Sequence, residues 1–328
     1  MQVTVLAGGI GAARFLLGLA AATGSTHEQP TITVIGNTGD DIRLFGLQVC
    51  PDLDSVMYTL GGGADGERGW GRANETFTVL EELRTYGAKP DWFGLGDRDI
   101  ATHLVRTQAL DAGYRLSSVT ARLAERWKLP VSLIPMTDDR VETHVVIDDP
   151  DTSQPQAIHF QEWWVRHRAA ITAQQFIYVG SDTAVPAPGV IEAIVNADVV
   201  LLPPSNPVVS IAPILSVPGI RAAVEMTSAP IIGISPIVGG SPVRGMADAC
   251  LSAIGVDTTA AAVAQHYGTR PNGGLLDGWI IDQTDASELE QISATGLRVE
   301  ATNTIFANPG TAESVANQAF ALASELSR

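Results

Sequence analysis

The chain opens with the stretch VTVLAGGIGAARFLLGLA at residues 3–20, which decides its fold. Its first five residues are apolar or β-branched, as in a strand that is buried on both faces. Three glycines follow at positions 8, 9 and 11, and apolar residues then recur at helical spacing. A second apolar run lies at residues 31–35. A strand, a glycine turn, a helix and another strand in this order are typical of the first unit of a parallel, doubly wound sheet.

Later parts of the chain extend this pattern. Short apolar runs bounded by turn residues predict further strands of the same sheet at residues 131–134, 176–179, 199–202, 231–234 and 297–300. A hairpin is predicted over residues 141–160 and a closing helix over residues 312–326. We therefore expect an α/β fold with a Rossmann-like, doubly wound parallel sheet formed by residues 1–55 and 129–328. Residues 56–128 have helical spacing, and we expect them to form a mostly helical insertion that covers the active-site crevice.

Composition and charge limit the function. The 328 residues include 20 Lys and Arg against 36 Asp and Glu, a formal charge of −16. A net anion gains nothing from neutralising phosphates, so we expect no nucleic-acid partner and no anionic membrane surface. No apolar run reaches the roughly 18–20 residues that cross a bilayer. The two cysteines, Cys50 and Cys250, have no metal-ligand spacing, and reduced thiols in a cytoplasmic protein are expected. A homodimer is the commonest assembly for such a chain.

The glycine turn is the first candidate site. Gly8, Gly9 and Gly11 let the backbone approach a phosphate closely, and the following helix offers unpaired N–H groups at its N-terminus. The dinucleotide fingerprint would have a third glycine where this chain has Arg14. The turn therefore predicts either a nucleotide site or a tight connection that binds nothing.

Four aspartates form the second candidate site: Asp40 and Asp41 after the second strand, then Asp52 and Asp54. Carboxylates at the carboxyl ends of parallel strands line the crevice in which open α/β sheets bind ligands. Close carboxylates repel one another unless a cation or a proton intervenes, so a Mg²⁺ site explains the cluster. Helix capping and turn formation explain many single aspartates, but four within fifteen positions on one predicted edge favour a functional site.

A third polar segment precedes a predicted helix. Its candidate residues for an anion or a polar substrate are Asp97, Arg98, Asp99, Thr102 and His103. On a helix that starts near Asp99, His103 lies four residues later and on the same face. A lone histidine is more often a structural residue than a catalyst.

Further polar residues follow other predicted strands. Asp138 lies in Met136-Thr137-Asp138-Asp139, and Ser205, Asn206 and Pro207 lie in a proline-bracketed loop suited to a base or a phosphate. Arg244 follows the last such loop and could contact a phosphate. Several loops that end at strand tips indicate a crevice. The chain has neither a P-loop lysine motif nor a Gly-x-Ser-x-Gly elbow, which favours metal-assisted phosphoryl-type transfer over hydrolysis.

Together these loops resemble one family, the 2-phospho-L-lactate transferases of coenzyme F-420 biosynthesis, called CofD in archaea and FbiA in actinobacteria. The resemblance covers about residues 1–245. Its matching pieces are Gly8–Gly11, Asn37-Thr38, Cys50–Val56, Trp70-Gly71-Arg72, Leu95–Asp99 with Ala101-Thr102-His103, Met136–Asp139, Phe160–Trp164, Pro204–Val208 with Ser210-Ile211, and Ser235-Pro236-Ile237. The Asn37–Asp41 segment is closer to the actinobacterial branch.

The resemblance implies a specific reaction. Members transfer a phosphoenolpyruvyl or phospholactyl group from a guanosine diphosphate-linked donor to the ribityl hydroxyl of the deazaflavin Fo, release GMP and require Mg²⁺. On this basis we expect catalytic roles for Asp54, Asp97 and His103, and a metal site made by Asp40, Asp41 and Asp54. Substrate contacts are expected from Asn37, Asp52, Arg98, Asp99, Thr102 and Asp138. The nucleotide is expected at Gly8, Gly9, Gly11, Ser205, Asn206 and Pro207.

Two other functions stay open. One is a regulator that binds a nucleotide sugar, as in relatives of the same superfamily that share the glycine turn and the Pro-Ser-Asn-Pro loop but carry out no transfer. The other is an NAD-dependent oxidoreductase, which the incomplete fingerprint and the missing acidic residue about 20 positions later disfavour. The sequence does not distinguish an enolpyruvyl from a lactyl donor.

Overall fold

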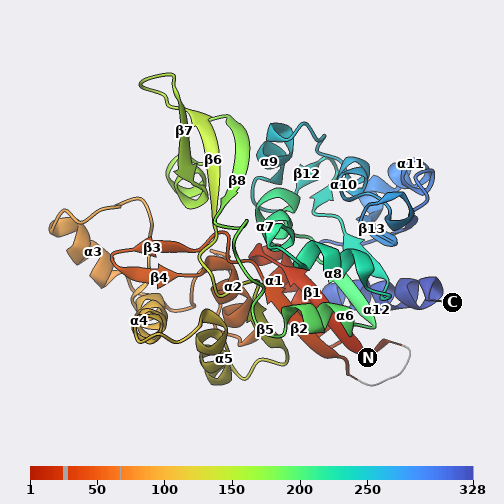
Figure 1. Cartoon of the computed structure of the whole chain (residues 1–328), viewed down its shortest axis with the longest axis horizontal. Helices are drawn as coiled ribbons and strands as arrows, with labels where there is room; N and C mark the ends of the chain where they lie inside the picture. The colour runs from red at the N-terminus through yellow and green to blue at the C-terminus, as the bar shows by residue number, and fades with distance from the viewer. Residues whose placement is uncertain (25–28, 67, 328) are drawn as a thin grey trace.

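The computed structural model describes residues 1–24, 29–66 and 68–327. Its centre is a seven-stranded sheet in the order β14-β13-β10-β9-β1-β2-β5, in which all neighbouring strands are parallel (Figure 1). Its strands are β1 Gln2–Ala7, β2 Thr31–Gly36, β5 Ser132–Pro135, β9 Val199–Leu202, β10 Ile231–Ile234, β13 Gly278–Asp282 and β14 Arg298–Thr302. The α/β, Rossmann-like fold that the sequence predicts is confirmed.

Helices cover both faces of this sheet. The α-helices of the described residues are α1 Gly9–Leu19, α2 Pro51–Leu60, α3 Thr78–Thr85, α4 Asp97–Asp111, α5 Leu116–Trp127, α6 Val190–Val195, α7 Ala212–Ser216, α8 Ile220–Met226, α9 Ala247–Ala253, α10 Ala260–Tyr267, α11 Leu289–Ser293 and α12 Pro309–Leu326, of which α3, α4 and α9 lie away from the main sheet. Shorter helical segments are η2 Glu162–Arg166, η3 Pro207–Ile211, η4 Arg270–Asn272 and η5 Gln283–Glu288. The hairpin of residues 42–49 and helices α3 to α5 lie on the left of Figure 1. Helices α10 and α11 lie on the right.

The two cores follow from the alternation of side chains along each strand. Val3 and Val5 of β1 pack in the layer that holds α1, α2 and α12, whereas Leu6 packs in the layer that holds α6, α8 and α10. Strand β9 alternates in the same way, with Leu201 in the first layer and Val200 in the second. Successive side chains of a strand point to opposite faces, so a strand covered on both sides is apolar throughout. This explains why the sequence shows continuous apolar runs.

Three small sheets are added to the main one. The hairpins β3 Ile42–Leu44 with β4 Leu47–Val49 and β11 Ile237–Val238 with β12 Ser241–Pro242 are antiparallel. A three-stranded antiparallel sheet, which we call the flap, has the order β7-β6-β8 and stands above the main sheet in Figure 1. Its strands are β6 Glu142–Asp148, β7 Pro155–His159 and β8 Ala173–Val179. The predicted hairpin over residues 141–160 is therefore confirmed.

The prediction for residues 176–179 is wrong in one respect. They are a strand, but β8 pairs with β6 in the flap and not with the parallel sheet. Gln174 and Gln175 at its start are exposed, so this strand has a polar part that a central strand of the main sheet lacks. The sequence also gave no prediction for β13, whose short run GWIID is fully buried between β10 and β14.

One close approach joins the first and last helices. A Cβ atom at Gly18 of α1 would lie 2.2 Å from the backbone nitrogen of Glu313 in α12, so only glycine lets the two helices pack this tightly. Nearby, the Asn317 side chain of α12 accepts a hydrogen bond from Gly24 N, and Phe15 packs on Phe306 with ring centres 5.8 Å apart. The helix that follows the glycine turn is therefore held in place by the end of the fold.

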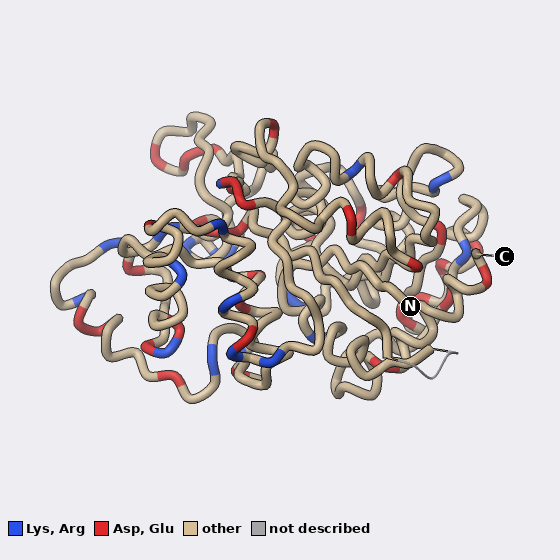
Figure 2. The backbone as a smooth tube through the Cα atoms, turned by 60° about the horizontal axis from the view of Figure 1, so that its bottom comes forward, with Lys and Arg blue, Asp and Glu red and all other residues tan. Residues whose placement is uncertain are grey.

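Charged residues of both signs are mixed along the chain (Figure 2). Among the described residues, no single helix has the length and apolar character needed to cross a membrane. One sharply bent pair, Pro207–Ser216 and Ile220–Met226, reaches that length and apolar character only when its two segments are counted together.

Candidate active site

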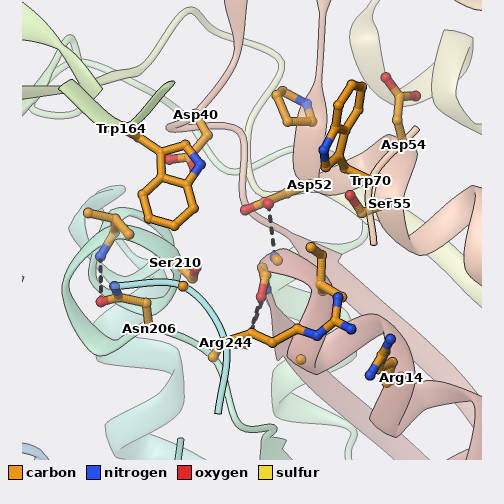
Figure 3. Close-up of a pocket in the computed structure, with 18 of the residues that line it drawn as sticks. Arg14, Asp40, Asp52, Asp54, Ser55, Trp70, Trp164, Asn206, Ser210 and Arg244 are labelled. Carbon is orange, nitrogen blue, oxygen red and sulfur yellow. Dashed lines mark hydrogen bonds between the residues drawn. The ribbon is translucent and has the colours of Figure 1, made fainter. Parts of the chain in front are cut away.

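A cavity of about 580 Å³ opens at the carboxyl edge of the main sheet. The loops that follow β1, β2, β9, β10 and β14 all contribute to its wall, as the sequence predicts for strand-end loops. The rest of the wall comes from α1, α2, α4, the loops around Trp70 and Phe93, residues 160–165, which include part of η2, and residues 243–247. Figure 3 shows residues from several of these segments around the cavity.

The glycine turn forms one side of the cavity. Gly9 has a φ of +76°, and its N–H donates to Asp52 Oδ1 at 2.8 Å. Ser205 Oγ donates to Gly8 O at 2.8 Å. A Cβ atom at Gly11 would lie 2.3 Å from Pro204 O. The turn is therefore pressed between α2 and the loop after β9, and both of these neighbours line the cavity.

Substitution of Gly11 tests this close packing. Gly11→Ala is expected to destabilise the protein by about 1–3 kcal/mol, because the methyl group must displace a backbone carbonyl. Denaturant unfolding measures the change. The control is Gly66→Ala, where an added Cβ meets nothing within 4 Å. Equal stability of the two variants would contradict the close contact.

Three aspartates of the predicted cluster are buried together. Asp52 accepts a second hydrogen bond, from Asn37 Nδ2 to Oδ2 at 2.8 Å. One carboxylate oxygen of Asp40 and one of Asp41 are buried with no hydrogen-bond partner. Burial raises the pKa of both carboxyls well above the usual range, and the charge of Asp52 adds to this effect at each of them. Burial also raises the pKa of Asp52, to about 6.

This arrangement suits a divalent cation. Asp40 and Asp52 line the cavity, whereas Asp41 lies behind the wall, where its backbone carbonyl accepts a hydrogen bond from His159 Nε2 of the flap at 3.1 Å. Buried carboxylate oxygens without donors are costly unless a proton or a cation satisfies them. Oxygen ligands of this kind are those that Mg²⁺ prefers. The residues present therefore fit the ion that the sequence predicts.

Asp54 lies in a different network. Both of its carboxylate oxygens accept hydrogen bonds from the buried guanidinium of Arg106 in α4, one of them at 3.1 Å. Among the described residues, the group of acidic and histidine ligand atoms within 4.8 Å of one another is Asp54, Asp99 and His103. The structure thus does not bring Asp40, Asp41 and Asp54 together as one set of ligands.

His103 is held inside this network. Its Nδ1 lies 3.1 Å from Arg106 Nη1, and since a guanidinium only donates, Nδ1 accepts and the proton of the neutral ring is assigned to Nε2. Nε2 lies 3.4 Å from Asp99 Oδ1 and has no hydrogen-bond partner. Tyr58 donates to that same Asp99 oxygen at 2.6 Å. Burial opposes ionisation of Asp99, but the neighbouring His103 imidazole and the Tyr58 hydroxyl outweigh it and lower the pKa of Asp99.

Other predicted residues lie outside the cavity wall. Asp97 accepts from the backbone N–H groups of Thr78 and Val79 and so caps α3, and Asp138 accepts from Ser117 N at 2.6 Å at the start of α5. Arg98 is exposed. Thr102 and Asn37 are buried, and Pro207 begins η3, but none of the three lines the cavity. The wall includes the other candidates: Gly8, Gly9, Gly11, Asp40, Asp52, Asp54, Asp99, His103, Ser205 and Asn206.

Several wall residues have no role in the prediction from the sequence. Tyr58 lies four residues after Asp54, on the same face of α2, and that spacing could have revealed it. Trp70, from the loop between α2 and α3, and Trp164, from η2, also line the cavity, and their indole rings lie on either side of Asp52 in Figure 3. Phe160 stacks on Trp164 with ring centres 6.5 Å apart. The cavity therefore has an aromatic part as well as an acidic one.

Comparison with known proteins places this geometry in a family. A family model described as 2-phospho-L-lactate transferase CofD matches residues 3–309. Proteins named phosphoenolpyruvate transferase are similar along nearly the whole chain: 58% identical over 326 residues in Streptomyces griseus, and 59% identical over 330 residues in Thermobifida fusca, each covering 99% of both chains. One from Mycobacterium sp. (strain KMS) is 53% identical over 323 residues and covers 95% of both.

A solved structure has the same fold. Protein BH3568 from Bacillus halodurans superposes with a TM-score of 0.62 at 17% identity, covering 98% of this chain and 99% of that one. At this identity the likeness concerns the fold alone. The family match and the relatives at more than 50% identity carry the stronger conclusion: this chain is a transferase that belongs to the 2-phospho-L-lactate transferase CofD family.

Proposed function

We propose that this protein transfers a phosphoenolpyruvyl group from a guanosine diphosphate-linked donor to the ribityl hydroxyl of Fo in coenzyme F-420 biosynthesis, with release of GMP. The observation that carries the proposal is that one cavity holds the glycine turn, the buried carboxylates and the two tryptophans together. The names of the relatives favour enolpyruvyl over lactyl as the three-carbon unit.

The donor would bind along the glycine turn and the loop after β9. The N-terminus of α1 has no acidic residue in its own first turn, and although Gly9 N already donates to Asp52 of α2, the other N–H groups of that turn would attract a phosphate. The Asn206 side chain accepts from Val208 N at 2.9 Å and so fixes the shape of the neighbouring loop. A loop held in this way can present its backbone to a nucleotide at little further entropic cost.

Mg²⁺ would be held by Asp40 and Asp52, which face the cavity, and when bound it would neutralise charge on the diphosphate and the leaving GMP. Asp54, whose counter-charge is Arg106, would accept a hydrogen bond from the ribityl hydroxyl and orient its oxygen. That oxygen attacks the phosphorus that carries enolpyruvate, and the P–O bond to GMP breaks. The hydroxyl proton passes to Asp54.

The flat deazaflavin ring would lie against the aromatic wall. Trp70 is 46% exposed, and Trp164 faces it across the acidic part of the cavity (Figure 3). An exposed tryptophan at a cavity mouth is costly to leave in water, and stacking of a planar ring on an aromatic side chain contributes about 1–3 kcal/mol.

Fluorescence titration with Fo tests this proposal, together with chromatographic detection of GMP. We expect micromolar Fo binding that responds to GDP and Mg²⁺, and one GMP released for each group transferred. Trp70→Ala and Trp164→Ala should each weaken Fo binding by about tenfold or more. The control is Tyr86→Ala, because Tyr86 is 84% exposed and lies outside the cavity wall. Absence of Fo binding alongside tight binding of a UDP-sugar would instead identify a regulator.

The proposal includes a cytoplasmic location and a homodimer. Cys50 and Cys250 are buried free thiols, which suits a reducing compartment. Light scattering of the purified protein measures the assembly directly.

A further inference from the structure

We propose that Arg14 and Arg244 together form an anion subsite of the cavity, which binds either the terminal phosphate or the carboxylate of the donor. This inference rests on the proposed function for the identity of the donor. It rests on the structure for the site itself. Arg14 lies on the second turn of α1, directly after the glycine turn, and Arg244 lies in the loop after β12. Both line the cavity, and their side chains converge beside the glycine turn in Figure 3.

The guanidinium groups of Arg14 and Arg244 lie close to each other in Figure 3. Among the described residues, neither makes an ion pair with a carboxylate, although the chain has 36 acidic residues against 20 basic ones. Other arginines near the cavity do have acceptors: Arg106 binds Asp54, Arg68 binds Asp65, and Arg72 donates to Arg98 O. Like charges placed side by side repel each other, and burial together with the charge of Arg244 lowers the pKa of Arg14. An anion between the two guanidinium groups would relieve this repulsion.

A glycine loop covers Arg244. Gly69 has a φ of +78°, and a Cβ atom there would lie 2.2 Å from Arg244 Nη1 and 3.8 Å from Ile10 Cδ1. Arg68 fixes this loop by donating to Arg72 O at 2.7 Å. The segment around Gly69 therefore lies directly on the Arg244 guanidinium and reaches the glycine turn. Partial cover of this kind reduces screening by water and strengthens binding of a charged ligand.

The cavity is consequently polarised. Asp40 and Asp52 place two carboxyl groups in one part, whereas Arg14 and Arg244 place two guanidinium groups in another. Planar guanidinium groups bind phosphate and carboxylate oxygens in pairs, which fixes the orientation of the ligand as well as its affinity. A donor whose metal-binding phosphates lie toward the carboxylates would extend its remaining anionic group toward Arg14 and Arg244. The subsite would thus set the direction in which the donor lies.

The experiment measures binding of GDP and GMP by calorimetry to the wild type, Arg14→Gln and Arg244→Gln. If the pair binds the terminal phosphate, the wild type prefers GDP to GMP and each variant loses about tenfold or more of that preference. If the pair binds the carboxylate, GDP and GMP affinities stay unchanged in the variants, while the KM of the complete donor rises about tenfold or more. Unchanged GDP, GMP and donor values in both variants would overturn the proposal.

Three controls separate the alternatives. Arg122→Gln removes an arginine whose side chain is 81% exposed on α5 and should change none of these values. Arg14→Lys keeps the positive charge but loses the planar guanidinium group, so it should restore part of the affinity that Arg14→Gln loses. Neither glutamine variant should lower the melting temperature, because each removes a like-charge repulsion; a fall in both would indicate a merely structural role. Fo titration of the wild type tests the proposed function separately, since GDP and GMP binding can be measured without Fo.

Discussion

Arg106→Met is expected to destabilise the protein by about 3–5 kcal/mol and to abolish transfer. Arg106 is 1% exposed, and its guanidinium is the counter-charge of Asp54, which is 4% exposed. It also donates to Gln48 O at 3.3 Å and contacts His103 Nδ1. Removing one partner of a buried ion pair leaves an uncompensated charge, and this accounts for the large loss. Urea unfolding at pH 8 measures it.

A double-mutant cycle isolates the pair. Asp54→Asn alone should also destabilise the protein strongly, since it leaves the Arg106 charge buried. The double variant Arg106→Met, Asp54→Asn should lose much less than the sum of the two single losses. Additive losses would show that Arg106 acts through packing and not through charge.

Asp40→Asn is expected to stabilise the metal-free protein while it slows transfer by about a hundredfold or more. Asp40 is buried, and one of its carboxylate oxygens has no partner, an arrangement that costs about 1–3 kcal/mol or more for a charged group. The expected loss of activity follows from the proposed Mg²⁺ site, because a catalytic metal is worth several kcal/mol and 1.36 kcal/mol is tenfold in rate. Thermal unfolding with and without Mg²⁺ and a GMP-release assay measure the two effects.

The stabilisation expected from Asp40→Asn depends on pH and increases as the pH rises. Burial raises the folded-state pKa of Asp40 above the unfolded value of 3.8, so the folded protein binds this proton more tightly than the unfolded chain does. The contribution of Asp40 to stability is therefore most favourable below pH 3.8 and falls as the pH rises toward the folded-state pKa. The advantage of Asp40→Asn should grow over that interval. Added Mg²⁺ should stabilise the wild type but not the variant.

The control for Asp40 is Asp111→Asn at an exposed ion pair, where both side chains are more than half exposed. It should change stability by less than about 1 kcal/mol and leave the response to Mg²⁺ intact. A wild type that is no less stable than Asp40→Asn at pH 8 would contradict the burial argument. If Mg²⁺ stabilised the wild type and Asp40→Asn equally, Asp40 would not be a ligand of the proposed cation site.

The sequence predicted the main sheet well because its signals are local. The strand, glycine turn and helix at residues 3–20 appear as β1, the turn and α1, and most later apolar runs appear as parallel strands. Residues 176–179 were assigned to the wrong sheet because an apolar run indicates a strand but does not identify its partner. Pairing of β8 with β6 depends on contacts between segments about 30 residues apart.

The site was predictable only in outline. An aspartate next to a helix start is both a good cap and a good ligand, and the sequence does not separate these uses: Asp97 and Asp138 turned out to cap α3 and α5. Asp54 was grouped with Asp40 and Asp41 because they are near in sequence. In the fold it pairs instead with Arg106, which is 52 positions away, and no short motif records such a contact.

The close packing of α1 on α12 has a consequence for how the protein is made. Strand β1 and the glycine turn leave the ribosome early, but α1 can reach its final position only when α12 is available to cover it. Since α12 follows every strand of the sheet in the chain, the glycine turn is among the first segments synthesised and among the last to be completed. A nascent chain that stalls before residue 309 would expose the apolar side of α1 and would be a substrate for chaperones.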